Sequence, residues 1–169
     1  MSEIPDGFEL PEKEAPHIRP SASLVATRDG ADGIEILFCH RVPQMPSFPD
    51  FWAFPGGGVT HFDRAAAEAL PGFSNDDKGA GLACLMREMV EEVGWAPASN
   101  KIIEVNPEIR AKVVIDGKNW HPLAKVGSLP SDSSRFNLIT IRTTPPLSPM
   151  RFANQFFHLH DPSPPEPTL

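Results

Sequence analysis

Three glutamates stand at helical spacing in the middle of the chain. Glu88, Glu91 and Glu92 lie one, three and four residues apart, so a helix would gather them on one face. Their mutual repulsion would weaken that helix by roughly a few tenths of a kcal/mol per pair. A hard divalent cation would offset the repulsion, because magnesium prefers carboxylate and water oxygens. We therefore predict a metal site here, with Arg87 holding one carboxylate through a forked pair of hydrogen bonds.

A glycine run lies upstream of these acids. Gly56, Gly57 and Gly58 follow the short apolar segment FWAF, which predicts a strand entering a glycine loop. A glycine backbone can approach a ligand closely, and its amides or carbonyls can complete a metal or phosphate site. A glycine run alone is more often a plain turn. Here the glycine run lies between a predicted strand and the acidic helix, and this position favours substrate binding by all three glycines.

The element that must position the glutamates is a helix within residues 81–94, GLACLMREMVEEVG. Its apolar residues recur at the spacing of one buried stripe, opposite the three glutamates, which are expected on an exposed face. Gly94 is placed to end this helix. The alternative is a solvated acidic helix face that binds nothing; the upstream glycine run makes this alternative weaker.

The rest of the chain predicts a mixed α/β domain. The runs ASLVAT and IEILFCHR flank the turn-rich RDGADG and predict a hairpin within residues 22–42. FNLITIR and RFANQFFHLH predict two later strands, and DRAAAEAL predicts a helical turn or two. The segment PEIRAKVVIDG fits either a helix or a strand. His158 and His160 would share one face of their strand, and an exposed strand edge is favoured over a metal pair.

Composition excludes several classes of protein. The length of 169 residues suits one domain, and the net charge of −7 argues against a nucleic-acid binder. The proline-broken start does not resemble a secretory signal, and no window predicts a membrane span, so a cytoplasmic location is expected. Cys39 and Cys84 are interpreted as reduced thiols in apolar surroundings. The tryptophans are interpreted as core or loop anchors rather than as a base-stacking platform; they are Trp52, Trp95 and Trp120.

The run from Arg87 to Trp95 resembles the second half of the Nudix box, Arg-Glu-apolar-x-Glu-Glu-x-Gly-apolar, at every position. The first half resembles Gly57, five residues and then Asp63, where the family has glutamate. Between Asp63 and Arg87 stand 23 residues where the family pattern has seven. An insertion inside the box is typical of a branch that includes a peroxisomal coenzyme A diphosphatase. The segment TTPPLSPMRFANQFFHLH is also similar to that branch.

The resemblance implies a Nudix-type α/β/α sandwich with a mixed sheet over residues 21–160, with residues 59–79 as the insertion. Residues 1–20 would be a flexible arm and residues 161–169 a proline-rich tail, too short for the strand and helix that the family usually has next. By position, the metal ligands would be Glu88, Glu91, Glu92 and the Gly57 carbonyl. Glu88 could instead be the base that activates water, and Arg87 would orient the acids.

The implied reaction is the Mg²⁺- or Mn²⁺-dependent hydrolysis of a nucleoside diphosphate linked to another group, with coenzyme A or an acyl derivative as the first candidate. The implied partner is this small organic diphosphate, and a homodimer is possible. A second hypothesis is a Nudix-like module that binds a nucleotide or metabolite without turning it over. A third, isomerisation of a diphosphate ester, would need a cysteine in the pocket. Glu104 and Glu108 are candidates, by charge alone, for a base outside the box.

Overall fold

The computed structural model describes residues 16–44 and 49–168. Strand β1 (Ile18–Gly30) begins three residues before the expected start of the domain at Ser21, and most of the expected N-terminal arm lies outside the described residues. A turn leads into β2 (Gly33–Ile36), which pairs antiparallel with the end of β1. The predicted hairpin is confirmed. Two short strands, β3 (Cys39–His40) and β4 (Trp52–Ala53), then pair with each other as a separate ribbon.

The glycine run forms a short strand rather than the expected loop. Strand β5 (Gly56–Gly58) pairs antiparallel with Ser21–Ser23 of β1. Gly56 has a φ of 150°, and an added Cβ there would overlap the Ala22 carbonyl oxygen, so only glycine fits this close pairing. The backbone of the glycine run is therefore fixed by the sheet.

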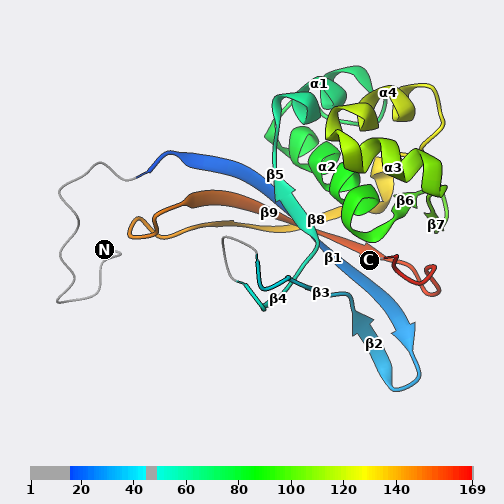
Figure 1. The fold of residues 1–169 in the computed structure, drawn as a ribbon, viewed down its shortest axis with the longest axis horizontal. Helices are drawn as coiled ribbons and strands as arrows, with labels where there is room; N and C mark the ends of the chain where they lie inside the picture. Colours follow the sequence, from blue (N-terminus) through cyan, green and yellow to red (C-terminus); the bar gives the residue numbers. More distant parts are fainter. Residues whose placement is uncertain (1–15, 45–48, 169) are drawn as a thin grey trace.

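The sheet is mixed, as predicted, with the order β2-β1-β9-β8 and with β5 also paired to β1. Strand β9 (Arg151–His160) runs parallel to β1, and β8 (Asn137–Thr143) runs antiparallel to β9. These two strands confirm the predictions for FNLITIR and RFANQFFHLH. Figure 1 shows that β1, β8 and β9 extend well beyond the helices, which gather over one end of the sheet.

The insertion supplies a helix of its own. Helix α1 (His61–Ala69) is longer than the turn or two expected, and it begins with a capping box between Thr60 and Asp63. Helix α2 (Asp77–Glu88) follows and continues as a π-helical turn, η1 (Met89–Val93), which Gly94 ends in the left-handed conformation at φ 76°. The predicted end of the helix is confirmed.

The core lies between α2 and the sheet. Leu24 of β1 and Phe157 and Leu159 of β9 are fully buried in one cluster with Leu85 and Met86 of α2. In contrast to the predicted single stripe, every residue from Gly79 to Arg87 is buried. The reason is that α1 covers the side of α2 that faces away from the sheet. The spacing of apolar residues in the sequence could not show that α2 also packs against α1.

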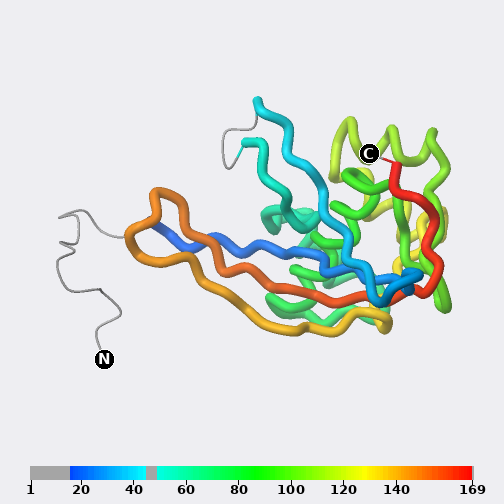
Figure 2. The backbone as a smooth tube through the Cα atoms, turned by 90° about the horizontal axis from the view of Figure 1, so that it is seen from below, coloured from blue at the N-terminus to red at the C-terminus, as the bar shows by residue number. Residues whose placement is uncertain are grey.

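The remaining elements surround the end of α2 that carries the glutamates. Strands β6 (Trp95–Pro97) and β7 (Ile102–Glu104) form a small antiparallel pair. Helix α3 (Pro107–Ile115) decides the open choice for PEIRAKVVIDG, and α4 (Trp120–Lys125) follows a short turn at Gly117–Asn119. Figure 2 shows the C-terminal segment running along this end of the molecule, where the Thr168 N–H donates to the Val93 carbonyl oxygen at 3.0 Å.

Among the described residues, no helix combines the length and the apolar character that crossing a bilayer requires. Both cysteines are free thiols, as expected, and Cys84 is buried whereas Cys39 is half-buried.

Candidate active site

Arg87 is the centre of the acidic cluster. It is only 7% exposed, and its Nε and Nη2 donate to the two carboxylate oxygens of Asp63 at 2.9 and 3.1 Å. Its Nη1 donates to Glu88 Oε1 at 2.8 Å and to Glu91 Oε2 at 3.0 Å. One guanidinium therefore holds three carboxylates, which is the forked geometry that arginine can supply and lysine cannot.

The capping box of α1 explains how Asp63 reaches Arg87 across 23 intervening residues. The Thr60 N–H donates to Asp63 Oδ2 at 2.8 Å, and Asp63 itself is 1% exposed. The insertion thus folds back as a helix whose first turn presents the acid to α2. Asp63 pairs with Arg87, and the shorter aspartate in the place of glutamate spans the distance because α1 packs directly on α2.

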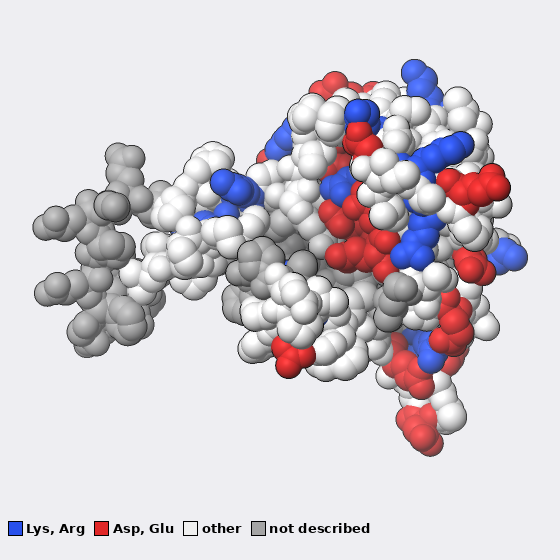
Figure 3. Space-filling model, viewed as in Figure 1, with Lys and Arg blue, Asp and Glu red and all other residues white. Residues whose placement is uncertain are grey.

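The glycine strand forms the neighbouring wall of the cluster. The Gly56 N–H donates to Glu92 Oε2 at 2.9 Å. A Cβ added at Gly57 would overlap Glu88 Oε1, so this carboxylate lies directly against the glycine backbone. In Figure 3 acidic and basic atoms lie side by side on the face turned to the viewer, over the region where Figure 1 draws α2 and α3. The expected constellation of glycine run and acidic helix is thus assembled in space, while the role of each residue stays a prediction.

Comparison with known proteins supports this assignment. A scan against models of protein families found no match, and no curated protein matched the chain. The solved structure of a NUDIX hydrolase from Alicyclobacillus acidocaldarius matches with a TM-score of 0.78 and 30% identity, over 90% of this chain and 74% of that chain. The chain belongs to the Nudix hydrolases. It is therefore an enzyme of a family of pyrophosphohydrolases, and its mixed α/β fold is the Nudix fold.

Two other solved structures are more distant. A MutT/nudix family protein from Enterococcus faecalis has a TM-score of 0.47 at 15% identity, over 95% of this chain and 44% of that chain. A C. elegans Ap4A hydrolase has a TM-score of 0.40 at 15% identity, over 90% of this chain and 72% of that chain. Neither bears on the substrate of this Nudix hydrolase.

Burial changes the acid strength of the cluster. It raises the pKa of Glu91 and of Glu92 to about 7, and it also raises the pKa of Glu88, although Arg87 opposes the shift at Glu88 and Glu91. The Gly56 N–H opposes the shift at Glu92. Partly buried carboxylates hold protons near neutral pH when too little positive charge stands beside them. With these partners alone, burial therefore disfavours the charged form of the three glutamates.

Nudix hydrolases generally use divalent metal ions, and the donors fit such an ion in chemical type. The assignment of Glu88, Glu91, Glu92 and the Gly57 carbonyl as metal ligands stays a prediction. Within residues 16–44 and 49–168, no group of three or more His, Cys, Asp or Glu side chains is arranged to hold a metal ion. Glu88 and Glu91 turn toward Arg87, and Glu92 turns toward Gly56. To share one ion, the carboxylates would have to turn toward a common point.

Cys84 and Gly117 contact the cluster, and the sequence did not indicate either. The Cys84 thiol lies against the carbonyl oxygens of Gly57 and Gly58 at 3.5 and 3.4 Å, and desolvation raises its pKa. Gly117 lies so close that an added Cβ would stand 2.7 Å from Glu91 Oε1. The Asp-Gly pair that precedes α4 was the only signal for this turn, and such pairs are common in turns of every kind.

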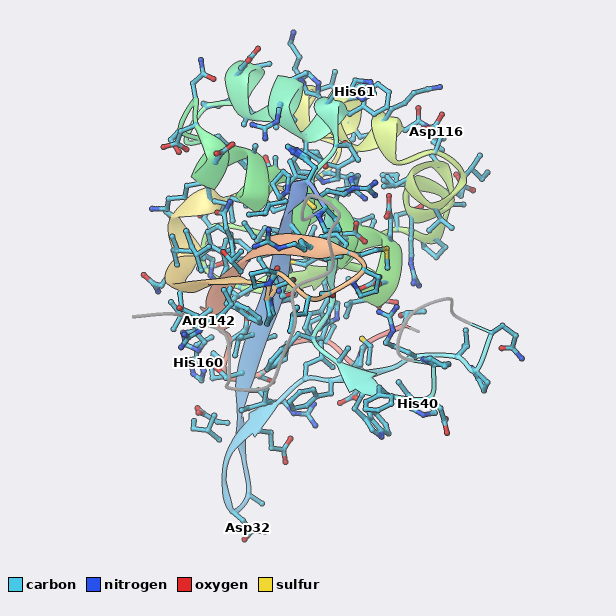
Figure 4. The ribbon with its side chains drawn as sticks, turned by 90° about the vertical axis from the view of Figure 1, so that its left-hand side faces the viewer. Asp32, His40, His61, Asp116, Arg142 and His160 are labelled. Carbon is cyan, nitrogen blue, oxygen red and sulfur yellow. The ribbon has the colours of Figure 1, made fainter. Side chains whose placement is uncertain are left out.

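The other candidate residues lie elsewhere. His158 and His160 are on β9; Asn137 of β8 pairs opposite His158, so the expected strand edge is wrong there, whereas His160 is exposed and has no β8 residue opposite it. Thr27 Oγ1 lies 2.9 Å from His158 Nε2 and 3.0 Å from His160 Nδ1, and Figure 4 shows His160 well away from the helices. Glu104 contacts Thr168, and Glu108 lies in the first turn of α3. Neither is joined to the carboxylates by a hydrogen bond or ion pair of the described residues.

Proposed function

We propose that this Nudix hydrolase cleaves an organic diphosphate with Mg²⁺ or Mn²⁺ bound by Glu88, Glu91, Glu92 and the Gly57 carbonyl. The observation that carries the proposal is the Arg87-centred group of carboxylates against the glycine strand. A divalent ion at this position would neutralise phosphate charge and make bound water a better nucleophile. Gly56, Gly57 and Gly58 would contact the substrate through their backbone.

The residues of the chain would perform the remaining steps. Arg87 fixes the orientation of Glu88 and Glu91, so that these carboxylates need little reorganisation during the reaction. Glu88 is either the third carboxylate ligand of the metal or, instead, the base that accepts a proton from the attacking water. The water oxygen bonds to one phosphorus, and the bridging oxygen leaves with the other phosphate. Two phosphorylated products result.

Coenzyme A or an acyl derivative is the first substrate candidate. Two sequence features support it, the insertion between Asp63 and Arg87 and the segment TTPPLSPMRFANQFFHLH, both similar to the coenzyme A diphosphatase branch. Nucleotide sugars, dinucleotides and modified nucleoside triphosphates are the other classes to test. A cytoplasmic location and a homodimer stay predictions, as does the division into an arm, a domain at residues 21–160 and a tail.

A binding module without turnover is the second candidate function. The observation that favours it is that each carboxylate already has a partner, because Arg87 holds Glu88 and Glu91 and the Gly56 N–H donates to Glu92. An isomerase is less favoured, because Cys84 is buried beneath the glycine strand and burial raises the pKa of the Cys39 thiol to about 11. A thiol of that kind is a poor acid and a poor nucleophile at neutral pH.

The experiment that separates the two candidates is product release from coenzyme A, nucleotide sugars and dinucleotides, with magnesium, with manganese and with a chelator. Metal-dependent cleavage at a diphosphate supports the hydrolase and identifies its substrate class. A folded protein that gains thermal stability from one of these compounds, but releases no product after long incubation, would support the binding module.

A further inference from the structure

The acidic helix ends in the π-helical turn η1, and this turn carries Glu91 and Glu92. In an α-helix the Gly94 N–H would donate to the carbonyl oxygen of Val90, four residues back. Here the Gly94 N–H donates to the carbonyl oxygen of Met89, five residues back. The Val90 carbonyl oxygen therefore loses its helical donor. Single π turns inside α-helices are rare and occur frequently at functional sites.

Arg110 supplies the missing donor. It lies on α3, which packs against η1 beside the end of α2 (Figure 1). The Arg110 Nε donates to the Val90 carbonyl oxygen at 3.1 Å, and its Nη2 donates to the Glu91 carbonyl oxygen at 2.9 Å. The last carbonyl groups of a helix lack donors within the helix, so an outside donor stabilises this end. One guanidinium thus holds two successive main-chain oxygens of η1.

The fold also fixes Arg110 itself. The Asn106 side chain caps the first turn of α3, and the Asn106 carbonyl oxygen accepts from the Arg110 N–H at 2.9 Å. Val113, one turn later, is fully buried in the core and anchors α3. A Cβ added at Gly94 would stand 3.3 Å from Arg110 Nη1, so the guanidinium lies directly against the left-handed residue that ends η1. Arg110 is therefore a fixed donor and not a mobile surface side chain.

The direction of two carboxylates depends on this turn. A π turn holds one more residue than an α turn, and one residue corresponds to about 100° of rotation around a helix. If the Gly94 N–H returned to the Val90 carbonyl oxygen, Glu91 and Glu92 would rotate about the helix axis by part of this angle. Glu92 Oε2, which accepts from the Gly56 N–H at 2.9 Å, would then turn away from the glycine strand.

We propose that Arg110 is a positioning residue of this Nudix hydrolase: by holding the carbonyl oxygens of Val90 and Glu91 it keeps the π turn and so directs the Glu91 and Glu92 carboxylates. This inference rests on the proposed function, because it explains how two of the proposed metal ligands are held in place. Arg110 acts through the main chain of η1, and it lies outside the Nudix box.

The first test detects the turn in the metal-free protein, without substrate. The amide resonance of Gly56 in NMR spectra reports the hydrogen bond from this N–H to the Glu92 carboxylate. Glu92→Ala removes the acceptor and gives the reference position of the resonance. Arg110→Met keeps the apolar stem but has no donor, and it should move the Gly56 resonance toward this reference. Arg110→Lys should move it less, because lysine can donate to one carbonyl but lacks the fork.

Arg151→Met is the matched control. Arg151 is half-buried, as Arg110 is, and its Nε also donates to a main-chain oxygen, that of Thr144, at 3.2 Å. This bond joins the ends of two strands and not η1. Arg151→Met should therefore lower Tm without moving the Gly56 resonance. The control separates a general loss of stability from a change in the turn.

The second test measures the affinity for Mn²⁺ alone, from the free ion in electron paramagnetic resonance spectra. Arg110→Met should weaken Mn²⁺ binding about 10–100-fold, which is the usual effect of removing a group that orients metal ligands. Arg110→Lys should restore part of this affinity, and Arg151→Met should bind Mn²⁺ as the wild type does. With a cleaved substrate and saturating metal, Arg110→Met should lower kcat and leave KM nearly unchanged.

The outcomes separate this inference from the proposed function. A Gly56 resonance that keeps its wild-type position in Arg110→Met would overturn the inference, even if metal-dependent hydrolysis is found. An equally large shift in Arg151→Met would overturn it as well. If the resonance moves only in the Arg110 variants, but the wild-type protein binds no Mn²⁺ and releases no product, the positioning by Arg110 is supported and the metal-dependent hydrolase is overturned.

Discussion

The buried pair between Arg87 and Asp63 allows the sharpest test of how the insertion supports the site. Asp63→Asn keeps the shape of the side chain but removes its charge. The amide has only one acceptor oxygen, so one of the two hydrogen bonds from Arg87, at 2.9 and 3.1 Å, loses its acceptor. The amide also weakens the bond from the Thr60 N–H that begins α1. Breaking one partner of a buried pair costs about 3–5 kcal/mol, and we expect the lower end, about 3 kcal/mol.

The matched control is the same substitution at an exposed pair. Asp77 accepts from Arg64 Nη1 at 2.8 Å and is 76% exposed, so Asp77→Asn should cost less than about 1 kcal/mol. Urea unfolding of the metal-free proteins measures the difference in the free energy of unfolding. In a thermal scan, a loss of about 3 kcal/mol in a chain of this size lowers Tm by about 6–12 °C.

The two variants also differ in what they do to the site. Asp63→Asn frees Arg87 to move, so Glu88 and Glu91 lose a fixed orientation and turnover should fall at substrate saturation. If Asp63→Asn and Asp77→Asn destabilise the protein equally, the insertion does not stabilise the box through this pair, and our account of its role is wrong.

Three further predictions concern the acidic cluster and the glycine strand. Glu91→Gln or Glu92→Gln should lower turnover at least about 100-fold with little loss of stability, and full activity in either variant would remove the metal-site proposal. Burial raises the pKa of Glu91 to about 7, so the folded metal-free protein keeps a proton that the unfolded chain releases near its ordinary value. The stability that this proton provides is complete below about pH 4.5 and is lost as pH rises through about 7, which lowers the free energy of unfolding by on the order of 2 kcal/mol. Urea midpoints measured at several pH values with a chelator should show this fall. The fall should be smaller in Glu91→Gln. Gly57→Ala should abolish most activity while leaving Tm within a few degrees, because its Cβ displaces only the end of a flexible carboxylate side chain; the control Gly58→Ala, whose Cβ meets open space, should leave Tm unchanged.

The sequence by itself determined the features of the site that depend on neighbouring residues. Glutamates at helical spacing, an arginine beside them and Gly94 at the helix end occupy positions close in sequence, and these positions alone predict the helix, its C-terminus and its acidic character. Apolar runs bounded by turn-rich or proline-rich stretches likewise predicted β8, β9 and the first hairpin, because such runs and their breaks are local features of the sequence. Arg87, Glu88, Glu91 and Glu92 could be predicted as a cluster because they are neighbours on one helix.

Only the tertiary structure decided how these pieces meet. Asp63 reaches Arg87 because α1 folds back on α2, and the same packing buries the face of α2 that the sequence pattern left to solvent. Gly117, from a turn far along the chain, closes on Glu91. The raised pKa of Glu91 and the exposure of the Trp52 ring both depend on which surfaces the folded chain covers. Burial depends on which distant segments pack together, and a one-dimensional pattern does not contain that information.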